Sequence, residues 1–186
     1  ESYADAFLHI SVDASGSMGG DKWDNTMTSV VAICKAVSMI QNVDVVVSIR
    51  STQSGSSNRS RGTDFPIILL AYDSRVDKFS KVKNLFPHIR CSGTTPEGLC
   101  YEAIMNEIVP SSNDRESYFL NFSDGMPMFS NSDVRYYQDT AINHTKKMVE
   151  EIKDRGIKVI SYFIGDTYDR SRNMDEFKRM YGKDSE

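Results

Sequence analysis

Five short apolar runs alternate with longer amphipathic segments along this chain, and that alternation restricts the fold more than any other feature. The runs are rich in β-branched and aromatic residues, which is typical of buried strands. We expect strands at Ala6–Val12, Val43–Ile49, Phe65–Tyr72, Ser117–Phe122 and Lys158–Ile164. Strands that alternate with helices form a mostly parallel sheet that is covered on both faces. The sequence therefore predicts an α/β domain of three layers.

The segments between these runs carry apolar residues at helical spacing. We expect helices at Trp23–Ile40, Lys81–Phe86, Pro96–Val109, Ser132–Arg155 and Asp175–Tyr181. Pro96 suits the first turn of its helix, because that position needs no N–H partner. Asp133 gives the long helix an acidic start, and Gly156 is a typical stop signal.

A polar stretch, Ser51–Asp64, joins the second and third predicted strands and is rich in Ser, Gly and Arg. Two strands joined by one loop of this kind form an antiparallel pair, so we expect one antiparallel edge strand in the sheet. The stretch reads as a solvated loop or hairpin tip. The alternative is a loop that binds a partner through Arg50, Arg59 and Arg61.

Length and composition narrow the class of protein. The 186 residues suit one domain, residues 1–186, and we expect it to be the C-terminal part of a longer chain. The net charge of −4 argues against a broad basic surface for nucleic acid. Three cysteines give no disulfide framework and match no zinc spacing, which favours buried thiols and a cytoplasmic location.

Polar side chains gather where the predicted strands end. Asp13, Ser15 and Ser17 follow the first strand, and Ser123 and Asp124 follow the fourth. In open α/β sheets, ligands bind beyond the carboxyl ends of the strands. Carboxylates and hydroxyls are ligands of hard divalent cations, and two neighbouring aspartates repel each other unless a cation lies between them. These residues therefore predict a Mg²⁺ site, where Mn²⁺ is also possible.

The sequence gives less support to other roles for these residues. The segment DASGSMGGDK lacks the GxxxxGK[ST] spacing of a phosphate-binding loop. The serines have no histidine nearby in the chain that could act as a base, and His9 lies inside the first strand, where a core histidine is expected. The remaining alternative is helix capping without a metal. We expect no catalytic residues in the domain itself.

Together the three segments resemble the von Willebrand factor A (VWA) family. They are Asp-x-Ser-x-Ser after the first strand, a threonine in CSGTTP and a distant Ser-Asp-Gly. The resemblance implies a Rossmann-like VWA fold with a metal-ion-dependent adhesion site (MIDAS). In the family, Mg²⁺ is bound by the positions that match Asp13, Ser15, Ser17, Thr95 and Asp124. Thr94 is the alternative to Thr95. An acidic side chain of a partner completes the metal coordination.

Within this family, the local sequences SGSM, GTTP and FSDGMP are most similar to those of the C-terminal domain of the cobaltochelatase subunit CobT, including CobT-like proteins of phages. That resemblance implies a non-catalytic subunit that docks on an AAA+ ATPase and on a larger chelatase subunit while a metal is inserted into a tetrapyrrole. Two alternatives stay open. One is an adhesion module on a cell or virion surface, and the other is an RNA-protein scaffold of Ro type.

Overall fold

The computed structural model describes residues 5–54, 63–165 and 170–182 of the chain, without the side chains of 170–172. The strands are β1 (Asp5–Asp13), β2 (Val43–Ser54), β3 (Asp64–Asp73), β4 (Arg115–Ser123), β5 (Phe129–Ser130), β6 (Arg135–Tyr136) and β7 (Lys158–Phe163). The α-helices are α1 (Asp21–Val37), α2 (Ser80–Leu85), α3 (Glu97–Ile104), α4 (Gln138–Asp154) and α5 (Arg170–Tyr181). None of the helices within this described part is long and apolar enough to span a membrane.

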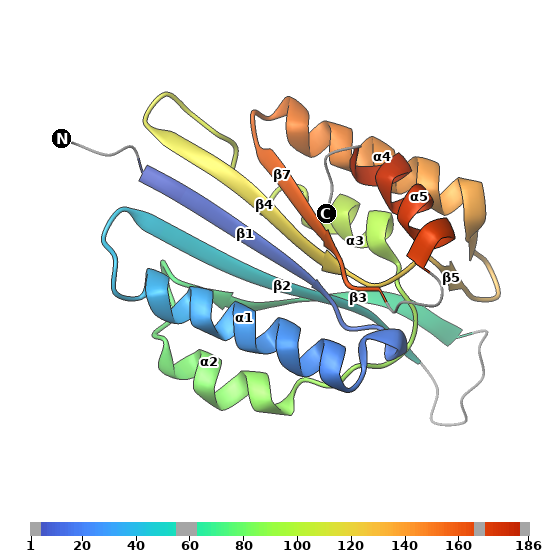
Figure 1. Cartoon of the computed structure of the whole chain (residues 1–186), viewed down its shortest axis with the longest axis horizontal. Coiled ribbons are helices and arrows are strands. Elements are labelled where there is room, and N and C mark those ends of the chain that lie inside the picture. Colours follow the sequence, from blue (N-terminus) through green and yellow to red (C-terminus); the bar gives the residue numbers. More distant parts are fainter. Residues whose placement is uncertain (1–4, 55–62, 166–169, 183–186) are drawn as a thin grey trace.

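Five strands form one sheet in the order β3-β2-β1-β4-β7 (Figure 1). The pairs β1–β2, β1–β4 and β4–β7 are parallel, and β3 pairs with β2 in the antiparallel sense at the edge. The predicted α/β class, with a mostly parallel sheet and one antiparallel edge strand, is therefore confirmed. Because β1 and β4 are parallel neighbours, their carboxyl ends lie at the same edge of the sheet.

Helices cover both faces of this sheet, which gives the predicted three layers. On one face, α1 and α2 pack against β1, β2 and β3 through a core that includes Ile10, Val30 and Val47. On the other face, α3, α4 and α5 share a second core with β4, in which Phe119 is fully buried. The helices α3 and α4 approach closely at Gly98, where an added Cβ would lie 2.9 Å from the backbone of Thr145.

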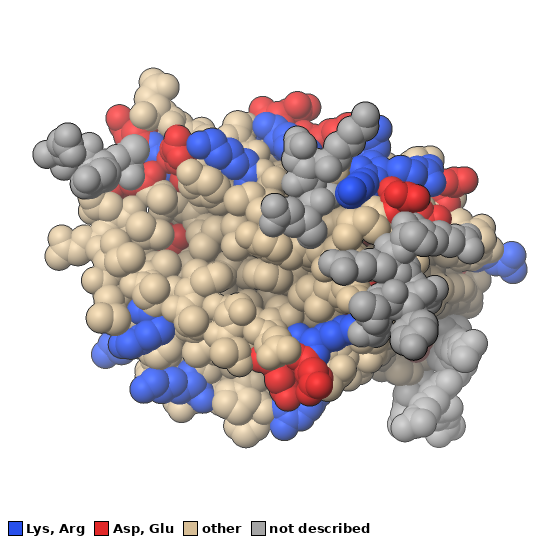
Figure 2. Space-filling view, viewed as in Figure 1, with Lys and Arg blue, Asp and Glu red and all other residues tan. Residues whose placement is uncertain are grey.

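One half of the first face is open. Side chains on β4 alternate in burial, and those on the α1 side are only partly buried. On β7 the same side exposes Ile160 and Tyr162, and the Tyr162 ring stacks on Phe122 at 5.3 Å. Figure 2 shows the surface over β1, β4 and β7 as largely uncharged, with Lys, Arg, Asp and Glu side chains along its rims.

The predicted long helix at Ser132–Arg155 is wrong at its start. Residues 129–136 form a two-stranded hairpin of β5 and β6, and α4 begins only at Gln138. The cause is Asn131, whose side-chain oxygen accepts hydrogen bonds from the backbone N–H groups of Asp133 (2.9 Å) and Val134 (2.7 Å). A side chain that binds its own backbone in this way favours a turn over a helix. Asp133 is therefore a turn residue.

Two other boundaries differ from the prediction. The helix expected at Pro96–Val109 ends at Ile104, where the Arg155 guanidinium donates to the carbonyl oxygen of Met105 at 2.6 Å. The stretch expected to be a loop from residue 51 continues β2 as far as Ser54, paired with the start of β3. The centre of that loop, with Arg59 and Arg61, lies outside the described residues, as does Asp166 after β7.

Candidate metal centre

The five side chains predicted to bind a metal come together at the carboxyl edge of the sheet. Asp13 is the last residue of β1, and Ser15 and Ser17 follow it in a tight turn before α1. Thr95 lies just before α3, and Asp124 directly after β4. Three separate segments, of which the second and third follow the first by 82 and 107 residues, thus place hydroxyl and carboxylate oxygens at one point. That they bind a metal stays a prediction.

Main-chain hydrogen bonds hold two of these segments together. The N–H of Ser92 donates to the carbonyl of Ala14 (2.8 Å), and the N–H of Gly16 donates to the carbonyl of Gly93 (3.1 Å). Gly93 has a φ of +69°, and a Cβ on it would lie 2.0 Å from the Thr52 hydroxyl oxygen. Only glycine fits this position, because it tolerates the positive φ and lets the loop pass close to β2.

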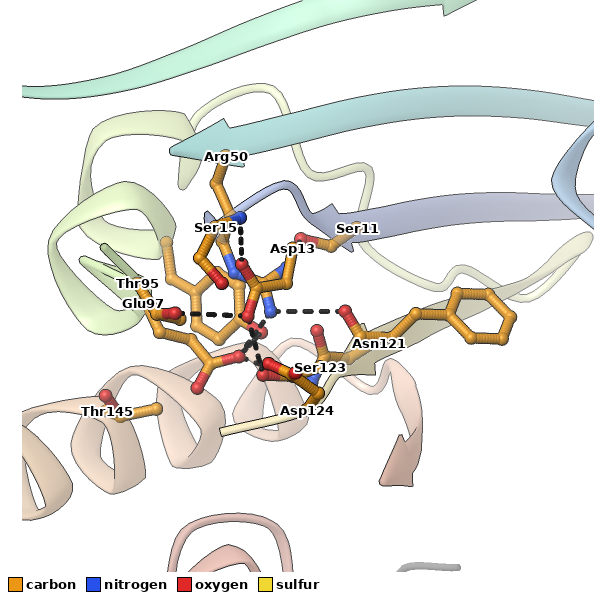
Figure 3. Close-up of polar contacts among 12 residues, drawn as sticks. Ser11, Asp13, Ser15, Arg50, Thr95, Glu97, Asn121, Ser123, Asp124 and Thr145 are labelled. Carbon is orange, nitrogen blue, oxygen red and sulfur yellow. Dashed lines mark hydrogen bonds and ion pairs between the residues drawn. The ribbon is translucent and has the colours of Figure 1, made fainter. Parts of the chain in front are cut away.

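Asp13 is fully buried, and hydrogen-bond donors surround its carboxylate. Its Oδ1 accepts the backbone N–H of Ser15 at 2.8 Å. Its Oδ2 accepts the hydroxyls of Thr95 and Ser123, each at 3.2 Å. Figure 3 shows the carboxylate between these side chains. Burial raises the pKa of Asp13, and the positive charge of Arg50 opposes that rise.

Asp124 forms the other half of the site and faces the two serines. Its Oδ1 accepts the hydroxyl of Ser17 at 2.8 Å, and the Ser17 hydroxyl oxygen lies 3.0 Å from that of Ser15. Its Oδ2 accepts a hydrogen bond from the ammonium of Lys22 at 2.9 Å. Ser17 is exposed, whereas Asp13, Ser15 and Asp124 are buried. A ligand would therefore enter from the solvent over Ser17.

The structure separates the two candidate threonines. Thr95 is buried and points its hydroxyl at the Asp13 carboxylate. Thr94 turns its backbone N–H to the hydroxyl of Thr52 at 2.9 Å, on the β2 side of the loop. The geometry therefore favours Thr95 as the threonine of the site.

The donor set suits a hard divalent cation. It consists of two carboxylates and three hydroxyls, which are the oxygen ligands that Mg²⁺ and Mn²⁺ accept. Within the part of the chain that the structure describes, no three or more His, Cys, Asp or Glu side chains lie together as a metal site. Any cation bound by this donor set would therefore need the hydroxyls as ligands in addition to the two carboxylates.

A buried ion pair lies beneath the site. The guanidinium of Arg50 is hydrogen-bonded to the Glu97 carboxylate, and both side chains are fully buried. Arg50 also donates to the hydroxyl of Ser11 at 2.8 Å, and its partner Glu97 accepts the hydroxyl of Tyr101 at 3.3 Å. Arg50 is next to Asp13 in the register of β1 and β2. The prediction that Arg50 belongs to a basic surface loop is therefore wrong.

Sequence reasoning missed this pair and also Lys22. A single arginine within the apolar run of β2 was a usable signal, because an arginine that is buried in a strand needs an acidic partner. Nothing local could have paired it with Glu97, which is 47 residues away. Lys22 lies 102 residues before Asp124 and just before the predicted start of its helix, so nothing local in the sequence linked the two residues.

His9 and His144 have structural partners outside the candidate site. The ring of His9 stacks on Phe119, and its Nε2 lies 2.8 Å from the Ser48 hydroxyl, so the predicted core role is confirmed. His144 has partners that the sequence did not suggest, with its Nδ1 3.1 Å from the hydroxyl of Tyr136. Cys34, Cys91 and Cys100 are free thiols, as predicted.

A groove of about 740 Å³ runs beside the site. Its floor is formed by Met27, Val82 and Phe86, between the first half of α1 and the end of α2. Trp23 lines its wall next to Lys22, and Arg90 lines it just before the loop that carries Thr95. Part of the groove wall therefore follows directly in the chain on Lys22, which contacts Asp124.

Comparisons with known proteins agree with this architecture. No protein-family model matches the sequence. A curated protein of Bacillus subtilis strain 168, the uncharacterized protein YojO, is 25% identical over 180 residues. That match covers 96% of this chain and 26% of YojO, so the chain spans about a quarter of its relative's length.

Solved structures give a broader likeness at low sequence identity. The pilus adhesin SpaC of Lactobacillus rhamnosus GG superimposes with a TM-score of 0.63 at 13% identity, over 97% of this chain and 27% of SpaC. The minor pilin PilB of Streptococcus sanguinis gives 0.65 at 14% identity, over the whole of this chain and 56% of PilB. The VWA domain of SpRpn10 gives 0.54 at 10% identity, over 94% of this chain and 82% of that one. The fold of this chain is the α/β fold of VWA domains.

Proposed function

We propose that this chain is a protein-interaction domain that docks on its partner through a divalent cation, Mg²⁺ or Mn²⁺. The observation that carries the proposal is the convergence of Asp13, Ser15, Ser17, Thr95 and Asp124 at one point, where Ser17 is exposed to solvent. Protein side chains that bind a cation on one side leave its outer side free for another ligand. A carboxylate of the partner would fill that position, because it offers a strong, negatively charged oxygen ligand.

Two further features of the chain support interaction rather than catalysis. The hydroxyls of Ser15 and Ser17 are hydrogen-bonded to each other, and that of Ser17 also donates to Asp124; no histidine lies among their partners in the described structure. The largely uncharged surface over β1, β4 and β7 and the groove beside the site are surfaces on which another protein could bury apolar area. The likeness of this chain to the pilus adhesin SpaC and to the VWA domain of SpRpn10 is consistent with a binding module.

For the partner, we propose two candidates that share this site. In the first, the domain is part of a cytoplasmic CobT-like subunit, cellular or phage-encoded. It would dock on an AAA+ ATPase and a larger chelatase subunit. This candidate is supported by the local sequences of the three motif segments and by the free cysteines. In the second, the domain is an adhesion module at a surface, which the likeness to SpaC and PilB favours. An RNA scaffold is less well supported, because Arg50 is buried.

A peptide-display experiment tests the common proposal and does not require the partner itself. A library of random 12-residue peptides is selected on the immobilised domain in MgCl₂ and eluted with EDTA. We expect the eluted peptides to share an Asp or Glu, and their binding to be lost with the Asp13→Ala and Asp124→Ala variants. Peptides that bind equally well in EDTA, or to both variants, would contradict the proposal.

The sequences of the complete gene and of its neighbouring genes distinguish between the two candidate partners. A neighbouring gene for an AAA+ ATPase, together with Mg²⁺-dependent binding of that purified ATPase to this domain, would support the chelatase candidate. A secretory signal at the start of the full protein would support the adhesion candidate.

A further inference from the structure

Lys22 occupies an unusual position for a lysine. It is the second residue of α1, close to the helix N-terminus, where the helix dipole disfavours a positive charge. The neighbouring acidic residues Asp21 and Asp24 are the types that such a position prefers. The stability of α1 therefore does not explain a lysine there. The lysine is explained instead by its ion pair with Asp124, which lies on a loop 102 residues further along the chain.

This ion pair uses an oxygen of the candidate metal centre. Asp124 accepts the Ser17 hydroxyl on Oδ1 and the Lys22 ammonium on Oδ2, so both oxygens already have donors. The Asp124 side chain is 1% exposed, whereas that of Lys22 is 21% exposed. A lysine has a flexible four-carbon stem, and this one therefore has a path into solvent.

We infer that Lys22 is a tethered cation that competes with the divalent ion for Asp124. This inference rests on the proposed metal site. A divalent ion held at Asp124 lies within a few ångströms of the ammonium and repels it, because like charges at such a distance interact strongly in a partly buried site. Metal binding therefore moves Lys22 away from Asp124. The free energy of that displacement reduces the affinity of the domain for its cation.

The Lys22–Asp124 ion pair also affects how a partner docks on the site. The domain holds Asp124 in place without a metal, because the ammonium balances the buried carboxylate. The displaced ammonium remains tethered at the mouth of the site, where the partner's carboxylate arrives. An acidic partner therefore meets two positive centres, and its binding strengthens the retention of the metal.

The test measures metal affinity in matched lysine variants. MgCl₂ and MnCl₂ are titrated into the wild-type domain, Lys22→Met, Lys22→Arg and Lys35→Met. Calorimetry and the fluorescence of Trp23, the single tryptophan of the chain, report binding. Lys35 lies at the other end of α1, with its ammonium 5.4 Å from the centre of the Phe79 ring, so Lys35→Met makes the same charge change away from the site.

We expect Lys22→Met to bind both ions about tenfold more tightly than wild type, the size of effect that loss of one partly buried competing charge gives. Lys22→Arg and Lys35→Met should stay within about twofold of wild type. Binding by Lys22→Met alone, with none to wild type, would also support the inference. Equal or weaker binding by Lys22→Met would overturn it and leave the metal site standing. No binding by any variant would overturn both.

Discussion

The buried ion pair of Arg50 and Glu97 gives the most quantitative prediction, through the substitution Arg50→Met. Both side chains are fully buried, and the guanidinium also donates to the Ser11 hydroxyl and lies 5.4 Å from the centre of the Tyr101 ring. Methionine fills a similar volume and carries no charge. The substitution therefore leaves the Glu97 carboxylate buried without its counter-ion.

Removal of one partner of a buried ion pair destabilises a protein by about 3–5 kcal/mol, because the remaining charge is left uncompensated. We expect the free energy of unfolding of Arg50→Met to be lower than that of wild type by an amount in that range. The double variant Arg50→Met/Glu97→Met removes both charges of this pair, so that neither is left buried without the other. It should therefore be more stable than the sum of the single substitutions predicts, by about 2 kcal/mol or more.

Urea unfolding followed by far-ultraviolet circular dichroism, at pH 7 in EDTA, measures these free energies. EDTA removes any contribution from bound cations. Additive effects of the two single substitutions, or an Arg50→Met variant within about 1 kcal/mol of wild type, would refute the reasoning.

Three further predictions concern single residues. Burial lowers the pKa of His9 to about 3, so the unfolded chain takes up a proton below pH 6.5 that the folded chain does not. Stability should therefore fall by about 2 kcal/mol between pH 6.5 and pH 5 in wild type relative to His9→Gln, measured by urea unfolding; parallel pH profiles would contradict this. Gly93→Ala should lower the melting temperature and weaken Mg²⁺ binding, because its Cβ would clash with Thr52; wild-type values for both would contradict the account of that loop. Asp13→Asn should be at least as stable as wild type in EDTA at pH 7, because it removes a buried charge; a large loss of stability there would show that the ionised carboxylate supports the fold.

The fold could be predicted from the sequence because its strongest signals are periodic and local. The apolar runs of β1, β2, β3, β4 and β7 lie within two residues of their predicted starts, and the antiparallel edge strand followed from the single polar loop that joins two of them. The prediction failed where one side chain redirects the backbone. Asn131 turns the chain into a hairpin, although the acidic residue after it resembles a helix start. Such competition is decided by individual hydrogen bonds, which periodicity does not report.

The candidate site could likewise be predicted from the sequence only in part. Asp13, Ser15 and Ser17 are close in the chain, and strand order alone places Asp124 beside them. The choice between Thr94 and Thr95 depended on resemblance, and the structure supports Thr95 through its hydrogen bond to Asp13. The charges that surround the site are non-local. Arg50 and Glu97 meet only because β2 and α3 are neighbours in space, and no spacing rule predicts that pair.

The measurement that tests the central claim most directly is a calorimetric titration of the domain with MgCl₂ and MnCl₂, beside the Asp124→Ala variant. Lys22→Met is titrated in the same series, so that competition by the ammonium does not hide the site. We predict one bound cation per domain, tighter binding in Lys22→Met and no binding in Asp124→Ala. Binding that persists in Asp124→Ala, or that is absent from both wild type and Lys22→Met, would contradict the proposed metal site.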